Sequence, residues 1–166
     1  MELLTFQSVH TPEAVAQVAA LAEEIWTEHY AAILSVEQIR YMVDKYQSVP
    51  AIEEQLTDKH YRYYLVIAAG KAVGYVGIQP EDGRLFLSKL YLRRSIRGRG
   101  YARRILAFLT GFCDGHGLHS IWLTVNRHNT GSIAVYEKLG FVKTQEQAAE
   151  IGRGYIMDDY IMEKYL

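Results

Sequence analysis

Residues 90–102 read LYLRRSIRGRGYA, and this stretch decides the fold. It begins as the end of a strand, passes through a loop that contains Gly98 and Gly100, and continues as a helix. The two glycines permit backbone conformations that other residues avoid, and they let a ligand approach the main chain. The first N–H groups of the helix point at the same spot, with the positive end of the helix dipole behind them. The stretch therefore predicts an anion site suited to a phosphate or a pyrophosphate.

Two common phosphate-binding motifs do not fit this loop. The dinucleotide fingerprint requires a glycine three residues after Gly100, where the chain has Arg103. The P-loop requires Gly-Lys followed by serine or threonine, but the Gly-Lys pair at residues 70–71 is followed by alanine. What remains is the pattern R-x-x-G-x-A over residues 97–102, placed after a strand.

This pattern resembles the R/Q-x-x-G-x-G/A loop of the GCN5-related N-acetyltransferases (GNAT), which binds the pyrophosphate of coenzyme A. Residues 129–141 (NTGSIAVYEKLGF) resemble the second signature of that family, the helix after its fifth strand. Residues 155–166 (YIMDDYIMEKYL) resemble its closing strand, so the similarity spans about residues 63–166. The chain is also loosely similar to bacterial spermidine/spermine-type acetyltransferases.

The resemblance and the order of elements both predict an α/β fold with a mixed (α+β) sheet. A GNAT-type acyl-CoA N-acyltransferase fold has a central, mostly antiparallel sheet with a splayed parallel pair and helices on both faces. We expect one domain over residues 1–166. The residue patterns predict helices that start at Thr11 and Ser35, a short helix over 51–56, strands over 61–69, 72–79, 85–92 and 121–125, helices over 100–115 and 130–139, and closing strands over 141–144 and 155–165 around a long loop.

Composition and charge exclude several classes of protein. The 166 residues are 49% hydrophobic and 22% charged, which is ordinary for a globular chain and excludes disorder. A net charge of −1 argues against binding nucleic acid by bulk positive charge. The arginines of residues 93–104 have the alternative interpretation of a solvated face or an RNA-binding patch, but no recognisable RNA-binding module accompanies them. Without a basic leader or a long apolar run, we expect a cytoplasmic protein.

The resemblance implies that acetyl-CoA is the co-substrate and that the quoted stretch binds it. In the family, the strand corresponding to residues 86–92 carries a bulge and splays from the strand at 121–125, and the pantetheine arm pairs with backbone in the gap. The turn after this strand would bind the pyrophosphate through its N–H groups. The cofactor-binding residues implied in this way are Leu90, Tyr91, Leu92, Arg97, Gly98, Arg99, Gly100, Tyr101, Ala102, Asn129 and Tyr136.

The resemblance also implies direct transfer, in which a neutral amine attacks the thioester. Coenzyme A leaves as a thiolate unless it is protonated, and a phenol with a pKa near ~10 can protonate a thiolate whose acid has a pKa near ~8.5. Tyr136 occupies the family's position for this acid, the alternative being a tyrosine that only packs in the core. Asn129 precedes it by two helical turns, where it would hold the pantetheine or order the start of the helix.

The sequence does not place a general base. The strand reads Leu87-Ser88-Lys89 where many relatives have a glutamate, which leaves a water chain or a side chain from elsewhere, such as His29 or Glu28. The acceptor groove is expected from the first two helices and the loop between the last two strands. The substrate-binding residues predicted for it are Trp26, Glu28, His29 and Tyr30.

The predicted function is therefore N-acetylation of a primary amine on a small molecule, with polyamines as one candidate, or on a peptide. The alternative is a non-catalytic acyl-CoA sensor, which has no need of a proton donor at Tyr136. We expect no nucleic-acid or membrane partner and, as is common in the family, a homodimer. No metal site is predicted, because His116-x-x-His119 lacks a carboxylate or thiolate partner at ligand spacing. Cys113 is predicted to pack in a helix, not to act as a nucleophile.

Overall fold

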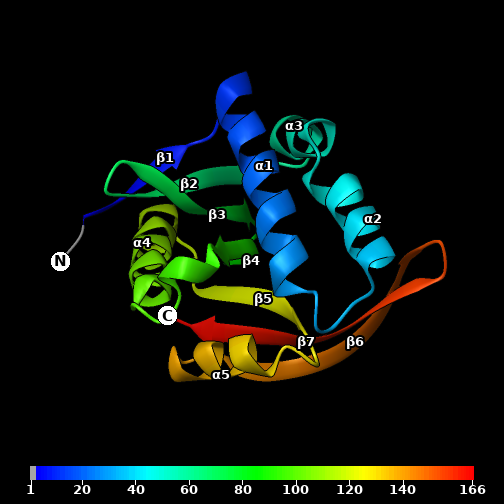
Figure 1. The fold of residues 1–166 in the computed structure, drawn as a ribbon. Coiled ribbons are helices and arrows are strands. Elements are labelled where there is room, and N and C mark those ends of the chain that lie inside the picture. Colours follow the sequence, from blue (N-terminus) through cyan, green and yellow to red (C-terminus); the bar gives the residue numbers. More distant parts are fainter. Residues whose placement is uncertain (1–2) are drawn as a thin grey trace. The chain divides into compact units, whose positions relative to one another are not determined.

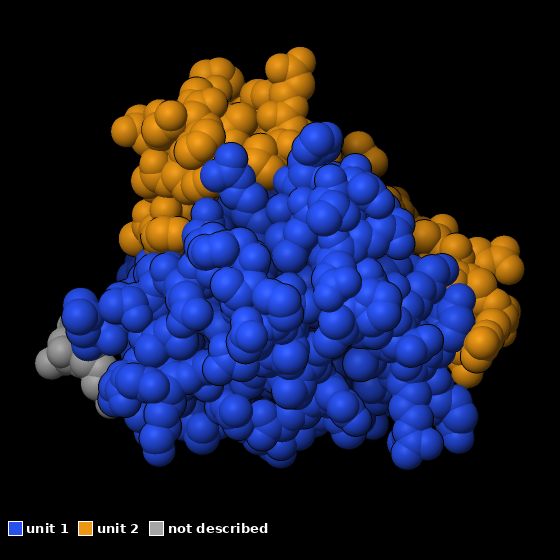
Figure 2. Space-filling view, turned by 90° about the horizontal axis from the view of Figure 1, so that it is seen from above, with its two compact units in different colours: residues 1–79, 88–104 blue, residues 80–87, 105–166 orange. Residues whose placement is uncertain are grey.

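A computed structural model of the protein describes residues 3–166. These residues form two compact units, which Figure 2 shows in different colours. The first unit consists of residues up to 79 together with 88–104, and the second consists of residues 80–87 and 105–166. A single domain over residues 1–166 stays a prediction.

In the first unit three helices accompany an antiparallel sheet, and α1 crosses the strands with α2 and α3 beside it (Figure 1). The strand order is β1-β2-β3-β4, with β1–β2 and β2–β3 antiparallel. The elements are β1 (Leu4–Ser8), α1 (Pro12–His29), α2 (Val36–Gln47), α3 (Val49–Asp58), β2 (Arg62–Ala68), β3 (Lys71–Pro80), the second half of β4 (Arg84–Leu92), a 3-10 turn (Arg94–Ile96) and the start of α4 (Tyr101–His116).

The second unit continues β4 with three more strands, in the order β4-β5-β7-β6. The parallel ladder between β4 and β5 covers three residue pairs, from Arg84↔Ser120 to Phe86↔Trp122. The β5–β7 and β6–β7 pairs are antiparallel, so the predicted mixed sheet with a parallel pair is confirmed. The elements that belong to this unit are most of α4, β5 (Ser120–Asn126), α5 (Thr130–Lys138), β6 (Val142–Gly152) and β7 (Tyr155–Tyr165).

Helix starts are where the capping residues predict them. The Thr11 hydroxyl accepts a hydrogen bond from the backbone N–H of Ala14 at 3.2 Å, and proline follows at the first helical position. The Ser35 hydroxyl accepts from the N–H of Gln38 at 3.1 Å. The third helix is longer than predicted because Ser48 caps it, and its hydroxyl accepts from an N–H three residues later.

At the sheet edges one strand was missed and one predicted loop is wrong. The strand β1 was not predicted, because it is short and only Leu4 among its five residues is buried. The long loop predicted after residue 144 is instead strand up to Gly152, followed by a tight turn at Arg153 and Gly154 with φ of 54° and 79°. Residues 145–150 (QEQAAE) have no large apolar side chain and are mostly exposed, so backbone pairing with β7 makes them a strand.

A buried chain of polar side chains joins α1, α2 and α3 to the sheet of the first unit. Gln47, which is fully buried, accepts from the Tyr75 hydroxyl at 2.6 Å and donates to the Tyr63 hydroxyl at 3.0 Å. The Trp26 indole donates to Tyr75 at 2.8 Å, and Tyr63 donates to Gln55 at 2.5 Å. Burial raises the pKa of both tyrosines, so their hydroxyls stay protonated and able to donate.

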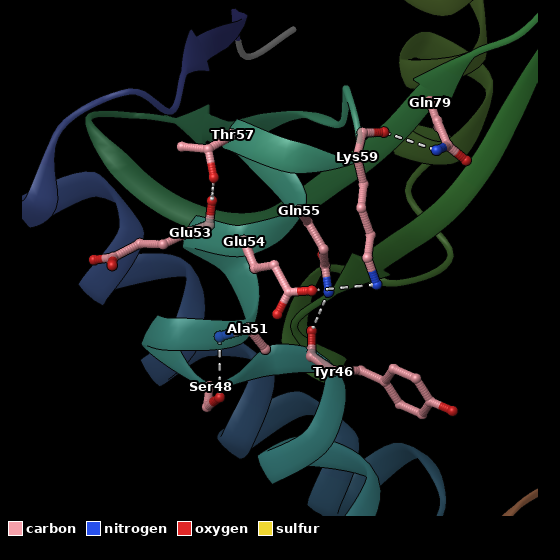
Figure 3. A network of polar contacts seen from close by, with 9 residues as sticks. All are labelled: Tyr46, Ser48, Ala51, Glu53, Glu54, Gln55, Thr57, Lys59 and Gln79. Atoms are coloured by element: carbon pink, nitrogen blue, oxygen red, sulfur yellow. Dashed lines mark hydrogen bonds and ion pairs between the residues drawn. The ribbon is translucent and has the colours of Figure 1, made fainter.

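Figure 3 shows how this chain continues around α3. The Gln55 amide donates to the backbone oxygen of Tyr46 at 2.8 Å, which links α3 to the end of α2. The Gln79 amide donates to the backbone oxygen of Lys59 at 2.8 Å, which ties the end of α3 to β3. The α2–α3 pair is therefore held to the sheet by buried amides as well as by apolar packing.

Replacing Gln47 with leucine should destabilise the protein by about 2 kcal/mol or more, because the Tyr75 hydroxyl loses its acceptor in a site that water does not reach. Urea unfolding measures this loss. The matched control is Gln145→Leu, at an exposed position of β6. Equal stability of the two variants would show that the buried chain does not hold the helices.

Candidate functional site

The turn between β4 and α4 has an open face. Gly98 and Gly100 adopt φ of 78° and 77°, the left-handed region that favours glycine. A Cβ built on either residue meets no atom within 4 Å. Within residues 3–166, the backbone N–H groups of Gly98, Arg99 and Gly100 donate to no acceptor. Successive unpaired N–H groups of this kind bind anions.

Side chains of the loop anchor this turn to the strand before it. The Arg97 guanidinium donates through Nε to the backbone oxygen of Leu92 at 3.2 Å. The Arg93 guanidinium forms an ion pair with Glu24 of α1 at 2.7 Å, and its backbone N–H donates to Val73 of β3 at 2.8 Å. Arg93 and Arg97 therefore have structural partners within the first unit.

Gly74 of β3 allows an unusually close approach of β4. A Cβ at this position would overlap the backbone oxygen of Tyr91 and lie 2.8 Å from the Leu92 side chain. The backbone of Leu90, Tyr91 and Leu92 is the segment that the sequence predicts for the pantetheine arm. Sequence analysis did not single out Gly74, because an isolated glycine inside a strand does not reveal which backbone passes close to it.

Three of the four predicted acceptor residues meet around Tyr91. The Tyr30 and Tyr91 hydroxyls lie 2.9 Å apart, and the rings of Trp26 and His29 have centroids 5.2 and 5.8 Å from that of Tyr91. Trp26 and Tyr30 are buried, His29 is half-buried, and the fourth residue, Glu28, is exposed. The structure thus gathers aromatic side chains of α1 at the end of β4.

Asn129 and Tyr136 belong to the second unit. The Asn129 side chain caps α5 by accepting from the N–H of Ser132 at 3.3 Å, which is one of the two roles predicted for it. Tyr136 is half-buried, and its ring meets Phe141 edge-on with centroids 5.5 Å apart. Partial exposure distinguishes Tyr136 from a fully buried core tyrosine.

Comparison with known proteins gives the family. Residues 18–141 match the model of the acetyltransferase (GNAT) family, which is most of the chain. The chain belongs to the GNAT family. The prediction of an acetyl-CoA-dependent N-acetyltransferase is confirmed at this level.

Relatives and solved structures agree with the family. An uncharacterised N-acetyltransferase of Mycobacterium tuberculosis is 28% identical over 151 residues, covering 90% of this chain and 96% of the relative. The PaiA N-acetyltransferase of Thermoplasma acidophilum, solved with coenzyme A, is similar with a TM-score of 0.81, 20% identity and 99% coverage of both chains. A mutant of the SpeG spermidine N-acetyltransferase of Vibrio cholerae is similar with a TM-score of 0.68, 18% identity, and coverage of 98% and 93%.

Of the two side chains considered as a base for this GNAT protein, His29 is a weak proton acceptor. Burial, and then the positive charge of Arg97, lower the pKa of the His29 imidazole to about 4. The imidazole is neutral at pH 7, but it holds an added proton poorly.

Sequence analysis considered Lys89 of β4 only as part of a stretch that lacks the glutamate found in many relatives. Its side chain is half-buried and donates to the Ser88 hydroxyl at 2.6 Å, which also accepts from the Tyr61 hydroxyl at 3.1 Å. Gly77 leaves room for the aliphatic part of the Lys89 side chain, since a Cβ at Gly77 would lie 3.2 Å from Lys89 Cγ. No carboxylate within the described chain pairs with this amine, and burial lowers its pKa to about 8.

The remaining sequence candidates take no part in this site. His116 and His119 are exposed, and the described residues contain no group of three His, Cys, Asp or Glu side chains able to hold a metal. Cys113 is buried, and burial raises the pKa of its thiol to about 11, which suits a packing residue. No helix formed by residues 3–166 combines the length and apolar character needed to cross a membrane.

The lowered pKa of Lys89 predicts unusual reactivity of its amine. Competitive labelling with acetic anhydride at a series of pH values, read by mass spectrometry, should give Lys89 half of its maximal rate near pH 8. Only the neutral amine reacts, and lysine in model peptides titrates near ~10.4. Exposed Lys138 is the internal comparison. Coincident profiles for the two lysines would contradict the effect of burial.

Proposed function

We propose that this protein transfers the acetyl group of acetyl-CoA directly to a primary amine of a small molecule or a peptide. The observation that carries the proposal is the turn after β4, where Gly98 and Gly100 are left-handed, the space on their Cβ side is open, and the backbone N–H groups of residues 98–100 are unpaired within the described chain. A pyrophosphate bound there would satisfy these groups and lie at the N-terminus of α4. Family membership supplies the class of ligand.

The cofactor supplies an activated acetyl thioester when it is bound. In the proposal, backbone groups of Leu90, Tyr91 and Leu92 hold its pantetheine arm, and the N–H groups of residues 98–102 bind its pyrophosphate. Arg97 supports this arrangement through its hydrogen bond to the backbone oxygen of Leu92. Asn129 acts by ordering the first turn of α5, so that Tyr136 is presented from a fixed helix.

Tyr136 is proposed as the proton donor for the thiolate of coenzyme A. The half-buried ring is held edge-on by Phe141, and its helix ends at Leu139, whose N–H bonds to the backbone oxygens of Val135 and Tyr136. A fixed phenol can give its proton to a thiolate and regain one from water.

The acceptor is proposed to be a primary amine, with polyamines as the first class to test. Exposed carboxylates on α1 favour a cationic acceptor. Glu23 and Glu28 are exposed in this way, whereas Glu24 is paired with Arg93. The test is a spectrophotometric assay of thiol release from acetyl-CoA. The panel of amines consists of spermidine, amino acids and lysine peptides. If acetyl-CoA binds but no amine of the panel causes thiol release, the alternative of a non-catalytic acyl-CoA sensor is favoured instead.

Gly100→Val should weaken coenzyme A binding by about 3 kcal/mol, or roughly 100-fold in Kd, because the side chain fills the cradle and removes charge-assisted bonds. Calorimetry with coenzyme A measures the affinity. Gly83→Val is the matched control, since Gly83 also has a φ near 78° and an unobstructed Cβ direction but lies in another turn. Unchanged affinity in the Gly100 variant would place the pyrophosphate elsewhere.

Tyr136→Phe should lower kcat by at least about tenfold and leave the affinity for acetyl-CoA nearly unchanged, because a positioned proton donor typically contributes roughly 100-fold or more to a rate. Steady-state kinetics with the best amine of the panel tests this. Tyr165→Phe, at an exposed position near the end of β7, is the control. A kcat equal to that of the wild type would remove Tyr136 from the mechanism.

A further inference from the structure

Asp159 of β7 is a buried carboxyl group without a compensating partner. Only 7% of the residue is exposed, and its Oδ1 has no hydrogen-bond partner within residues 3–166. The other buried carboxylate, Glu163, accepts from the Ser120 hydroxyl at 2.5 Å and lies 3.7 Å from the Arg84 guanidinium. Buried charges in proteins are normally paired in the way that Glu163 is, so Asp159 calls for a functional explanation.

The ladder between β5 and β7 shows which face of the sheet Asp159 occupies. It runs from Ser120↔Tyr165 to Asn126↔Asp159 without a register shift, so side chains alternate regularly along both strands. Asp159 therefore shares a face with Glu163. Lys164 points to the opposite face, where its amine donates to the backbone oxygen of Leu139 at the end of α5. The helix that carries Tyr136 thus packs on the side of these strands away from Asp159.

The charged groups near Asp159 do not neutralise it. Its neighbour Asp158 alternates to the other face and is 3.0 Å from Arg127, which also pairs with Glu146 of β6 at 3.4 Å. Arg127 lies over the Tyr160 ring on that side. The cross-strand neighbours of Asp159 itself are Asn126 of β5 and Gln147 of β6, which are uncharged.

Burial, together with the negative charge of Asp158, raises the pKa of Asp159 to about 6. At pH 7 about nine-tenths of the group is nevertheless ionised. The folded protein thus holds a largely buried anion with no cation beside it, which costs stability. A ligand that brings its own positive charge would remove that cost.

We propose that the Asp159 carboxylate binds the amino group of the acetyl acceptor and takes the proton that its nitrogen loses when the amide bond forms. This inference rests on the proposed acetyl transfer. Asp159 is the register partner of Asn126, directly after the part of β5 that is expected beside the pantetheine arm. Paired residues of an antiparallel ladder lie about 5 Å apart between Cα atoms, so the carboxylate is one strand away from that segment.

The atoms balance without another reactant. The neutral amine nitrogen forms a bond to the acetyl carbon, the carbon–sulfur bond breaks, and the electron pair leaves with the sulfur. The acceptor binds as an ammonium ion, and its first proton passes through the Asp159 carboxylate to solvent before the neutral nitrogen attacks. The proton that the nitrogen loses as the amide forms follows the same route, while the thiolate receives a proton from Tyr136, which regains one from solvent.

The same carboxylate selects the class of acceptor. It attracts a primary alkylamine that is cationic in water, and it repels an amine with a carboxylate of its own close by. We therefore expect polyamines and lysine side chains in peptides to be accepted in preference to free α-amino acids.

The test compares Asp159→Asn with Asp158→Asn, a neighbouring carboxylate on the opposite face that is paired with Arg127. With each variant, kcat/KM for spermidine is measured against pH. The Asp159 variant should lose about 100-fold in kcat/KM, as expected for a missing proton acceptor, and should lose the rise in rate near pH 6. The affinity for acetyl-CoA and the activity of the Asp158 variant should remain near wild type.

A second measurement needs no turnover. The folded pKa of Asp159 lies above the value near ~3.9 of an unfolded chain, so its contribution to stability is present below pH 4 and is lost as pH rises through about 6. The Tm of Asp159→Asn should therefore exceed that of the wild type above pH 6 and match it at pH 4. Spermidine should raise the Tm of the wild type at pH 7.5 but not that of this variant.

Equal kcat/KM of wild type and Asp159→Asn would overturn the inference, as would a spermidine-induced rise in Tm that persists in the variant. If the wild type transfers acetyl to no amine, the proposed function fails, and the spermidine shift in Tm then decides by itself whether Asp159 binds an amine. Asp159→Ser provides a second neutral variant if the asparagine side chain finds a new hydrogen bond.

Discussion

The left-handed conformation of the turn at Gly98 and Gly100 is the constraint on which the proposed function of this protein depends. Gly98 and Gly100 hold the turn after β4 in a left-handed conformation, and the space over both is open. Arg97 anchors the turn to Leu92, and Gly74 lets the same end of β4 lie close against β3. The end of β4 and the turn that follows it are thus held together by these contacts, and the turn is the support proposed for a pyrophosphate.

Burial displaces the pKa of several side chains of this protein from its ordinary value. Burial lowers the pKa of the Lys89 amine to about 8 and raises the pKa of the Asp159 carboxyl group to about 6. The same effect lowers the pKa of His29 to about 4, which makes it a poor base. Buried groups without a counter-charge are candidates for functional sites, because keeping them in the fold costs stability.

Sequence reasoning identified the features that depend on neighbours along the chain. The caps at Thr11 and Ser35 and the loop at residues 97–102 follow from local backbone chemistry and are confirmed as structure. The polar strand over residues 145–150 was missed because its stability comes from pairing with β7. Gly74, Lys89 and Asp159 were missed because their environment is created by other strands.

The amino-acid sequence by itself determined the family, the helix starts and the glycine turn after β4, because each rests on residue types at short fixed spacing. Only the tertiary structure decided which polar groups are deprived of water. Asp158 and Asp159 are identical and adjacent in sequence, yet one is paired with Arg127 and the other is buried without a partner. The alternation of side chains in a paired strand separates them, and burial then sets the free energy of each charge.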